Sequence, residues 1–206
     1  MKLGLSLLLL IAAGGCQTRS QVQEYETRPW PLQSHCGWIL ETPHYQIFTT
    51  VKDRDFHAAA ATLAEGQYLR FHGDLAVEPR EKMTVYVFAD VNQWVAFTEA
   101  RFPARARDYI RIRSGGYAVE NLAVFYYLGR FPTLTIMAHE LFHLYINQAA
   151  SPEPVPAWIN EGLATYYEAH EWKGCTSVFT PNKNLFRRNN LSDALCRKKL
   201  FPLKQL

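Results

Sequence analysis

The chain has 206 residues, with 22 lysines and arginines against 19 aspartates and glutamates, which gives a formal net charge of +3. This near balance gives no reason to expect nucleic acid as a partner. The length fits one domain, or one domain with a small second lobe, and is sufficient to bury a hydrophobic core.

The beginning of the chain has the layout of a secretory signal. Lys2 precedes an apolar run over residues 3–13, and a pair of glycines follows. The run is about half of the roughly 20 apolar residues that a permanent membrane helix needs. The stretch AAGGC, which ends at Cys16, resembles the bacterial lipobox. We therefore expect a lipoprotein signal peptide over 1–15 and a lipid on Cys16, with an ordinary cleaved signal and a free Cys16 as the alternative.

The segment over residues 16–37 is polar, contains two prolines and has no sustained hydrophobic period. These features predict a tether between the lipid and a domain over residues 38–206. Because Gln17 rather than aspartate follows Cys16, the sorting rules of lipoproteins favour the outer membrane, facing the periplasm. We expect a lipid-anchored protein of the bacterial cell envelope that contacts the membrane through Cys16.

Three further cysteines lie at positions 36, 175 and 196, an odd number in a compartment where disulfides form. One disulfide and one free thiol is the simplest arrangement. Cys175 and Cys196 flank one loop-rich stretch and are the preferred pair. A bridge from Cys36 to either of them remains open, because pairing cannot be deduced from sequence.

The first elements of the expected fold are a strand, a helix and a strand. Residues 44–51 alternate and are rich in aromatic and β-branched side chains, which predicts a strand. Asp53 or Asp55 can cap an alanine-rich helix that Gly73 can end. Residues 82–90 predict a second strand, in the centre of a sheet.

A helix over residues 92–102 is expected next, and a basic patch follows it. Such a patch could hold a substrate carboxylate, although a solvated surface is the better-supported interpretation. Its members are Arg101, Arg105, Arg107, Arg111 and Arg113.

A hairpin and two helices complete the pattern. Two apolar runs predict a β-hairpin over residues 115–127. The spacing is helical over 132–148, where Pro132 suits the first turn. A proline-rich loop separates this helix from a second one over residues 157–172.

The stretch IMAHELFHLYIN, residues 136–147, contains two histidines four positions apart. On a helix, His139 and His143 leave from one face with Cβ atoms about 6 Å apart. Their nitrogens can therefore converge on one zinc ion at about 2.0–2.1 Å. Glu140 is rotated roughly 100° around the axis, where a base can take a proton from water that zinc acidifies. The alternative is that both histidines are core or surface residues that hydrogen-bond to their neighbours and bind no metal. A single histidine would favour that interpretation, but two at helical spacing around a glutamate do not.

Catalytic zinc usually has three protein ligands, so a third is required. The extended motif HExxHxxGxxH is not met, because its last two fixed positions are Ile146 and Ala149. Glu161, early in the next expected helix, is the best-placed third ligand. Other acids compete with it and are expected to be surface charges instead: Glu153, Glu168 and Glu171.

Glu161 lies in the stretch PAWINEGLATYY, which fits the pattern PxWxxEGxAxY. The matching residues are Pro156, Trp158, Glu161, Gly162, Ala164 and Tyr166. Together with HExxH, this stretch resembles the gluzincin metallopeptidases, most closely small bacterial peptidase families of that group. The resemblance covers about residues 132–172.

The resemblance implies His139, His143 and Glu161 as zinc ligands, and Glu140 as general base and then proton donor. It implies an α+β fold of the thermolysin-like zincin type, with a mixed sheet packed on the HExxH helix. It also implies that an edge strand, for which the hairpin over 115–127 is the candidate, aligns an extended peptide.

The residue that stabilises the oxyanion stays open: Tyr166 and Tyr167 are candidates, although a core tyrosine is the more common case, and a residue of the C-terminal lobe is an equal alternative. Relatives continue into a helical lobe after the second helix, whereas a short, basic C-terminal part follows Trp172 here. It could face anionic lipid, or it could be an exposed basic tail.

These patterns predict a Zn²⁺-dependent peptidase that hydrolyses a peptide or protein substrate in the cell envelope. The alternative is a non-catalytic, zinc-containing envelope lipoprotein that binds a peptide or protein partner. Glu140 argues against it, because a purely structural zinc site needs no base. A metal-free edge-strand binder would leave both motifs unexplained.

Overall fold

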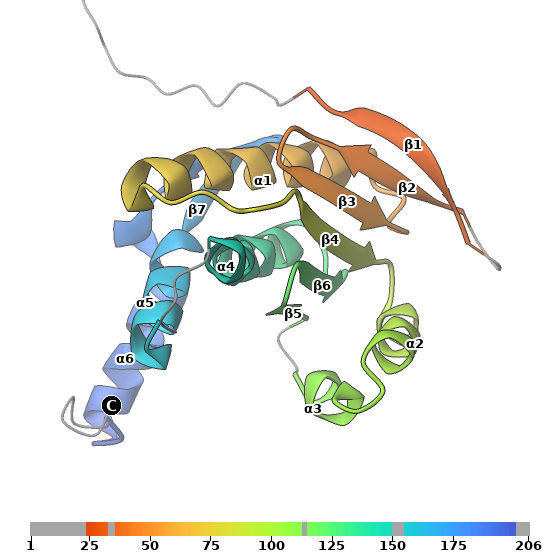
Figure 1. Cartoon of the computed structure of the whole chain (residues 1–206). Coiled ribbons are helices and arrows are strands. Elements are labelled where there is room, and N and C mark those ends of the chain that lie inside the picture. The colour runs from red at the N-terminus through yellow and green to blue at the C-terminus, as the bar shows by residue number, and fades with distance from the viewer. Residues whose placement is uncertain (1–23, 33–35, 113–114, 150–154, 201–206) are drawn as a thin grey trace, which may run out of the picture.

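The computed structural model describes residues 24–32, 36–112, 115–149 and 155–200 (Figure 1). The elements follow in this order: β1 (Glu26–Pro31), β2 (Cys36–Glu41), β3 (Tyr45–Thr49), α1 (Arg54–Leu75), β4 (Met83–Phe88), α2 (Val91–Arg101), α3 (Ala106–Ile110), β5 (Gly116–Val119), β6 (Leu122–Tyr126), α4 (Arg130–Gln148), α5 (Ala157–Tyr167), β7 (His170–Lys173), β8 (Thr176–Phe179), the 3₁₀ turn η1 (Pro181–Lys183) and α6 (Leu185–Cys196).

Six strands form one mixed sheet in the order β1-β2-β3-β4-β6-β5. β3, β4 and β6 run parallel to one another, because α1 returns the chain between β3 and β4, and the antiparallel strand β5 returns it between β4 and β6. β1, β2 and β5 are antiparallel to their neighbours. The expected hairpin is present as β5 and β6, and β5 is an edge of the sheet.

The sheet has a hydrophobic core on each face. Side chains alternate between the faces along a strand, so Val85 and Phe125 contact the core under α1 and α4, whereas Val124 and Tyr117 contact the core beside α2 and α3. The expected α+β fold, with a mixed sheet against the helix that carries HExxH, is therefore present.

The long helix α1 begins as expected but does not end at Gly73. The carboxylate of Asp53 accepts hydrogen bonds from two free N–H groups of the first turn, as an N-cap does. The helix continues to Leu75 and closes at Ala76, which has a left-handed φ of 51°. Leu75 packs against the core and Asp74 accepts a hydrogen bond from Tyr167, and these contacts offset the cost of a glycine inside the last turn.

Part of the segment expected as a tether belongs to the sheet. Residues 26–31 form β1, which pairs along its whole length with β2. The aromatic ring of Trp30 packs against Phe48 and Tyr86, which anchors the strand. Its two prolines are compatible with this position because β1 is an edge strand. The polar composition of this segment gave no sign of a strand, because the strand depends on the packing of Trp30 against the sheet.

The second predicted helix is shorter than expected. α5 ends at Tyr167 instead of residue 172, because the side chain of Glu168 turns inward onto charged partners and the chain then forms the β7–β8 hairpin. Gly174, with a φ of 64°, provides the left-handed residue that this tight hairpin needs.

The three cysteines within the described ranges are all free thiols, so the preferred disulfide between Cys175 and Cys196 is not formed. Among the helices that the structure describes, none is both long and apolar enough to cross a membrane. The signal peptide, Cys16 and Gln17 lie outside the described residues.

Candidate metal centre

Helix α4 places two histidines on one face. Leu141, Leu144 and Tyr145 on its other faces are fully buried, so the orientation of the helix is fixed by the core. The His139 and His143 side chains remain 14 % and 11 % exposed, and their Nε2 atoms lie 3.3 Å apart.

Helix α5 packs against α4 and brings a carboxylate to the same point. Glu161 Oε2 lies 3.4 Å from His139 Nε2, and Glu161 Oε1 lies 3.5 Å from His143 Nε2. The side chain of Glu161 is 64 % exposed, so the cluster is open to solvent on one side. The sequence named these three residues as ligands, and the structure brings them together.

The other ring nitrogens are held by two acceptors. His139 Nδ1 lies 2.8 Å from Glu168 Oε2, and His143 Nδ1 lies 3.1 Å from Asn160 Oδ1. An ionised carboxylate only accepts, and the amide oxygen does the same, so both Nδ1 atoms carry the proton. Each Nε2 atom therefore directs a lone pair towards the other and towards Glu161.

Two lone pairs and a carboxylate that face one another would together stabilise a cation placed between them. Zinc–nitrogen bonds of about 2.0–2.1 Å in a tetrahedron place neighbouring donor atoms about 3.3–3.4 Å apart. The three observed separations are 3.3, 3.4 and 3.5 Å. Imidazole and carboxylate donors in this number also match a catalytic zinc set, which leaves one position for substrate or water. The residues present therefore fit a zinc ion.

The acceptor behind His139 is strongly ionised. Burial alone would raise the pKa of Glu168, but hydrogen bonds from Arg187, His139 and Asn184 outweigh it and lower the pKa to about 2. Burial opposes protonation of His139, yet its bond to Glu168 and the nearby acids raise its pKa. Burial and the charge of His139 lower the pKa of His143, while its bond to Asn160 and the charge of Glu161 act in the opposite direction. Zinc binding would require both Nε2 atoms to be free of a proton.

Glu140 lies beside the three ligands and outside their set. Burial raises the pKa of its carboxyl group to about 7, while the charge of His139 and the N–H of Ala118 act in the opposite direction. The hydrogen bond from Ala118 ties this carboxylate to the edge strand β5. A carboxyl group with a pKa near neutrality can both accept and release a proton.

The free edge of β5 presents main-chain groups next to Glu140. Tyr126 N–H donates to Gly115 O, and Gly116 pairs with Phe125 one step along. Because antiparallel pairs alternate between bonded and non-bonded positions, Gly116 and Ala118 direct their N–H and C=O groups away from β6. These groups face the side on which β5 has no neighbouring strand in the described sheet, although Gly116 itself is buried.

The competing acids have other positions. Glu168 is the partner of His139 Nδ1, not a member of the triad, and Glu171 is exposed and pairs with Lys183. Glu153 lies outside the described residues. The surface-charge expectation was therefore wrong for Glu168. A signal existed, since seven residues, or nearly two turns, separate it from Glu161 and place both on one side of α5.

Asn160 was also missed, although it directly precedes Glu161. We expect Asn160→Ala to weaken zinc binding by about 10–100-fold, as loss of a partner behind a histidine ligand commonly does. Zinc affinity measured by competition with a chelating dye checks this, with the exposed Asn92→Ala on α2 as the matched control. Equal affinities for Asn160→Ala and the parent would show that this hydrogen bond does not orient His143.

The two tyrosines considered for the oxyanion differ in position. The Tyr167 hydroxyl donates to Asp74 and its ring packs against Phe71 and Phe142, so it is a core residue. Tyr166 is half exposed and packs against Phe179. Neither hydroxyl has a described contact with the metal triad, and the oxyanion partner stays unassigned.

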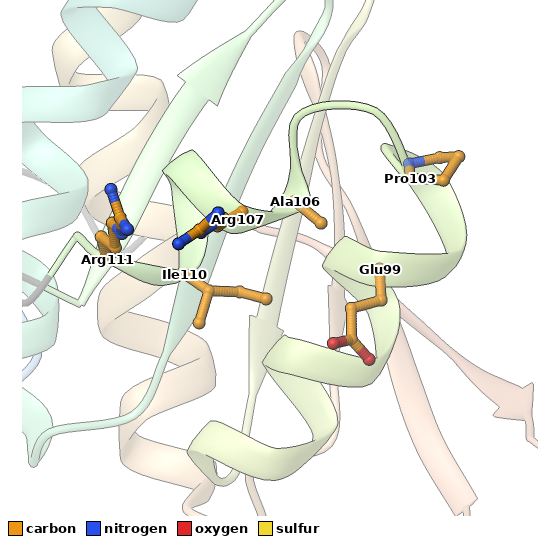
Figure 2. Close-up of a pocket in the computed structure, with 6 residues that line it drawn as sticks. All are labelled: Glu99, Pro103, Ala106, Arg107, Ile110 and Arg111. Carbon is orange, nitrogen blue, oxygen red and sulfur yellow. The ribbon is translucent and has the colours of Figure 1, made fainter.

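The arginine patch is dispersed over the surface. Arg101 pairs with Glu120, and Arg105 lies over the ring of Tyr109. Arg107 of α3 and Arg111, which directly follows that helix, line a groove of about 610 Å³. Figure 2 shows both arginines across from Glu99 of α2. The groove is not lined by the histidines or Glu161, and Arg113 lies outside the described residues. The solvated-surface interpretation fits this arrangement.

Comparison of the chain with protein-family models, curated proteins and solved structures finds no match.

Proposed function

We propose that this chain is a zinc-dependent peptidase that hydrolyses peptide bonds in the bacterial cell envelope. One observation carries the proposal: His139 Nε2, His143 Nε2 and the Glu161 carboxylate face one another at 3.3–3.5 Å, the separations of a tetrahedral zinc set. A zinc ion bound there would supply Lewis acidity, which acidifies water and polarises a carbonyl group.

Glu140 performs the proton transfers of this reaction. Its partly buried carboxylate accepts a proton from the attacking water and then returns it to the leaving amine. Burial adjusts the pKa of the group towards neutrality, where both transfers are possible. The N–H of Ala118 holds the carboxylate between the cluster and the strand along which a substrate would lie.

The substrate is an extended peptide that adds a strand to the edge of the sheet. Gly116 N–H and C=O and Ala118 C=O would bond its main chain. Main-chain pairing selects for extended backbone and tolerates many side chains, as a peptidase requires. The mixed sheet, its antiparallel edge and the two ligand helices support a thermolysin-like zincin fold of the gluzincin type.

The envelope location rests on the lipobox-like AAGGC stretch. We expect Cys16→Ser to release the protein from the membrane fraction, because the lipid would lose its attachment site. Membrane fractionation and mass spectrometry of the N-terminal peptide test this. A parent whose Cys16 carries no lipid would remove the anchor from the proposal without affecting the metal site.

The peptidase activity is tested with a library of peptides derived from a proteome. New termini found by mass spectrometry should appear with the zinc-loaded protein, disappear with 1,10-phenanthroline and return when zinc is restored. Protein that binds one zinc per chain yet yields no new termini would favour the non-catalytic envelope lipoprotein.

A further inference from the structure

Helix α6 contributes a charged residue to the back of the metal centre. Arg187 Nε lies 2.7 Å from Glu168 Oε1, and its Nη2 lies 2.8 Å from Oε2, which is a two-point contact. Asn184, the N-cap of α6, donates to the same Oε1 at 3.0 Å. Glu168 Oε2 also accepts from His139 Nδ1 at 2.8 Å. An unbroken chain of contacts thus joins α6 to a ligand of the metal.

Glu168 depends on these partners because its side chain is only 6 % exposed. A carboxylate withdrawn from water is stable only when other groups replace its hydration. Arg187 supplies a fixed guanidinium fork that matches both oxygens. Without it, the Glu168 side chain would no longer be fixed on both oxygens, and His139 would lose the acceptor that orients its ring.

The rest of α6 makes little contact with the fold. The helix extends away from the sheet (Figure 1) and packs only weakly against any other described element. Leu185, Leu191 and Leu195 are more than half exposed. The polar contacts of Asn184 and Arg187, including the bond from Asn184 to Thr165 O, therefore lie where α6 joins the body.

We infer that Arg187 is a positioning residue of the metal centre, and that zinc binding and the docking of α6 are coupled through Glu168 and His139. The inference rests on the zinc site of the proposed function. Coupling of this kind is reciprocal: if docked α6 strengthens zinc binding, bound zinc strengthens the docking of α6.

The test compares zinc affinities of purified variants by competition with a chelating dye. Loss of a partner directly behind a histidine ligand commonly weakens metal binding by about 10–100-fold. Arg187 acts through such a partner, Glu168, so we expect Arg187→Leu to bind zinc more weakly than the parent, by up to that amount. The matched control is Arg188→Leu, which removes a neighbouring exposed arginine of the same helix and should leave the affinity unchanged. Arg187→Lys keeps the charge but loses the fork, so its loss should be intermediate.

Two further measurements separate positioning from a loss of folding. Circular dichroism of the metal-free variants shows whether each is folded. If Arg187→Leu is unfolded, Arg187→Lys takes its place in the comparison. Glu168→Gln should weaken zinc binding as well, and the double variant should lose no more than Glu168→Gln alone, because both residues act through one contact. If the double variant instead lost zinc affinity by the product of the two single losses, Arg187 would not act through Glu168.

The reciprocal effect is read by hydrogen exchange. Zinc should slow amide exchange in α6 of the parent and of Arg188→Leu, but not in Arg187→Leu. Equal zinc affinity for Arg187→Leu and the parent, or an equal loss in Arg188→Leu, would overturn the inference while leaving the zinc site intact. A parent that binds no zinc would instead overturn the proposed function itself.

Discussion

Replacement of Glu140 with glutamine is expected to abolish peptide hydrolysis while leaving the zinc content of the protein unchanged. Glutamine has the same shape and its amide oxygen can still accept from Ala118 N–H, so the local structure is retained. It cannot accept a proton at neutral pH. Loss of a general base costs about 10²–10⁴-fold in rate, which should appear in kcat.

The control for this prediction is Glu171→Gln, which changes an exposed acid that pairs with the exposed Lys183. Its rate and zinc content should both equal those of the parent. Cleavage by zinc-loaded Glu140→Gln at the parental rate would refute the assignment of the base, and with it the peptidase mechanism.

Replacement of Glu161 with alanine is expected to remove zinc binding. The change deletes one of three zinc donors and leaves two histidines. Loss of a residue that only hydrogen-bonds to a ligand lowers metal affinity by up to roughly 100-fold, so loss of a ligand itself should lower it further. Because Glu161 is 64 % exposed, its loss removes little packing, and the metal-free variant should unfold at the same temperature as the metal-free parent. Isothermal titration with zinc gives the affinity.

The competing third ligand is tested in the same experiment. Glu153→Ala changes an acid of the loop between the two ligand helices and should bind zinc as tightly as the parent. If Glu161→Ala retained zinc and Glu153→Ala lost it, the third donor would come from the loop, and the 3.4 and 3.5 Å contacts of Glu161 would have another meaning.

The main elements around the site could be predicted because each has a local signal. The four-residue spacing of His139 and His143 fixes a shared helical face, and the proline-rich stretch predicts the break before α5. The hairpin that supplies the edge strand follows from two apolar runs separated by Glu120 and Asn121. Contacts between these elements then bring the three predicted ligands together.

The missed features all depend on contacts between distant parts of the chain. β1 is polar in composition and forms because Trp30 packs on an aromatic cluster of β3 and β4. Glu168 is buried because Arg187, 19 residues further along, neutralises its charge. Composition and periodicity report local preference, and they do not report such partners.

The central claim is that one metal ion lies between His139, His143 and Glu161. The most direct measurement is X-ray diffraction from crystals of the zinc-loaded protein, collected on both sides of the zinc absorption edge. We predict a single anomalous peak that appears only above the edge, about 2.0–2.2 Å from both Nε2 atoms and a Glu161 oxygen. No peak at this position, or a peak bound by other residues, would contradict the account.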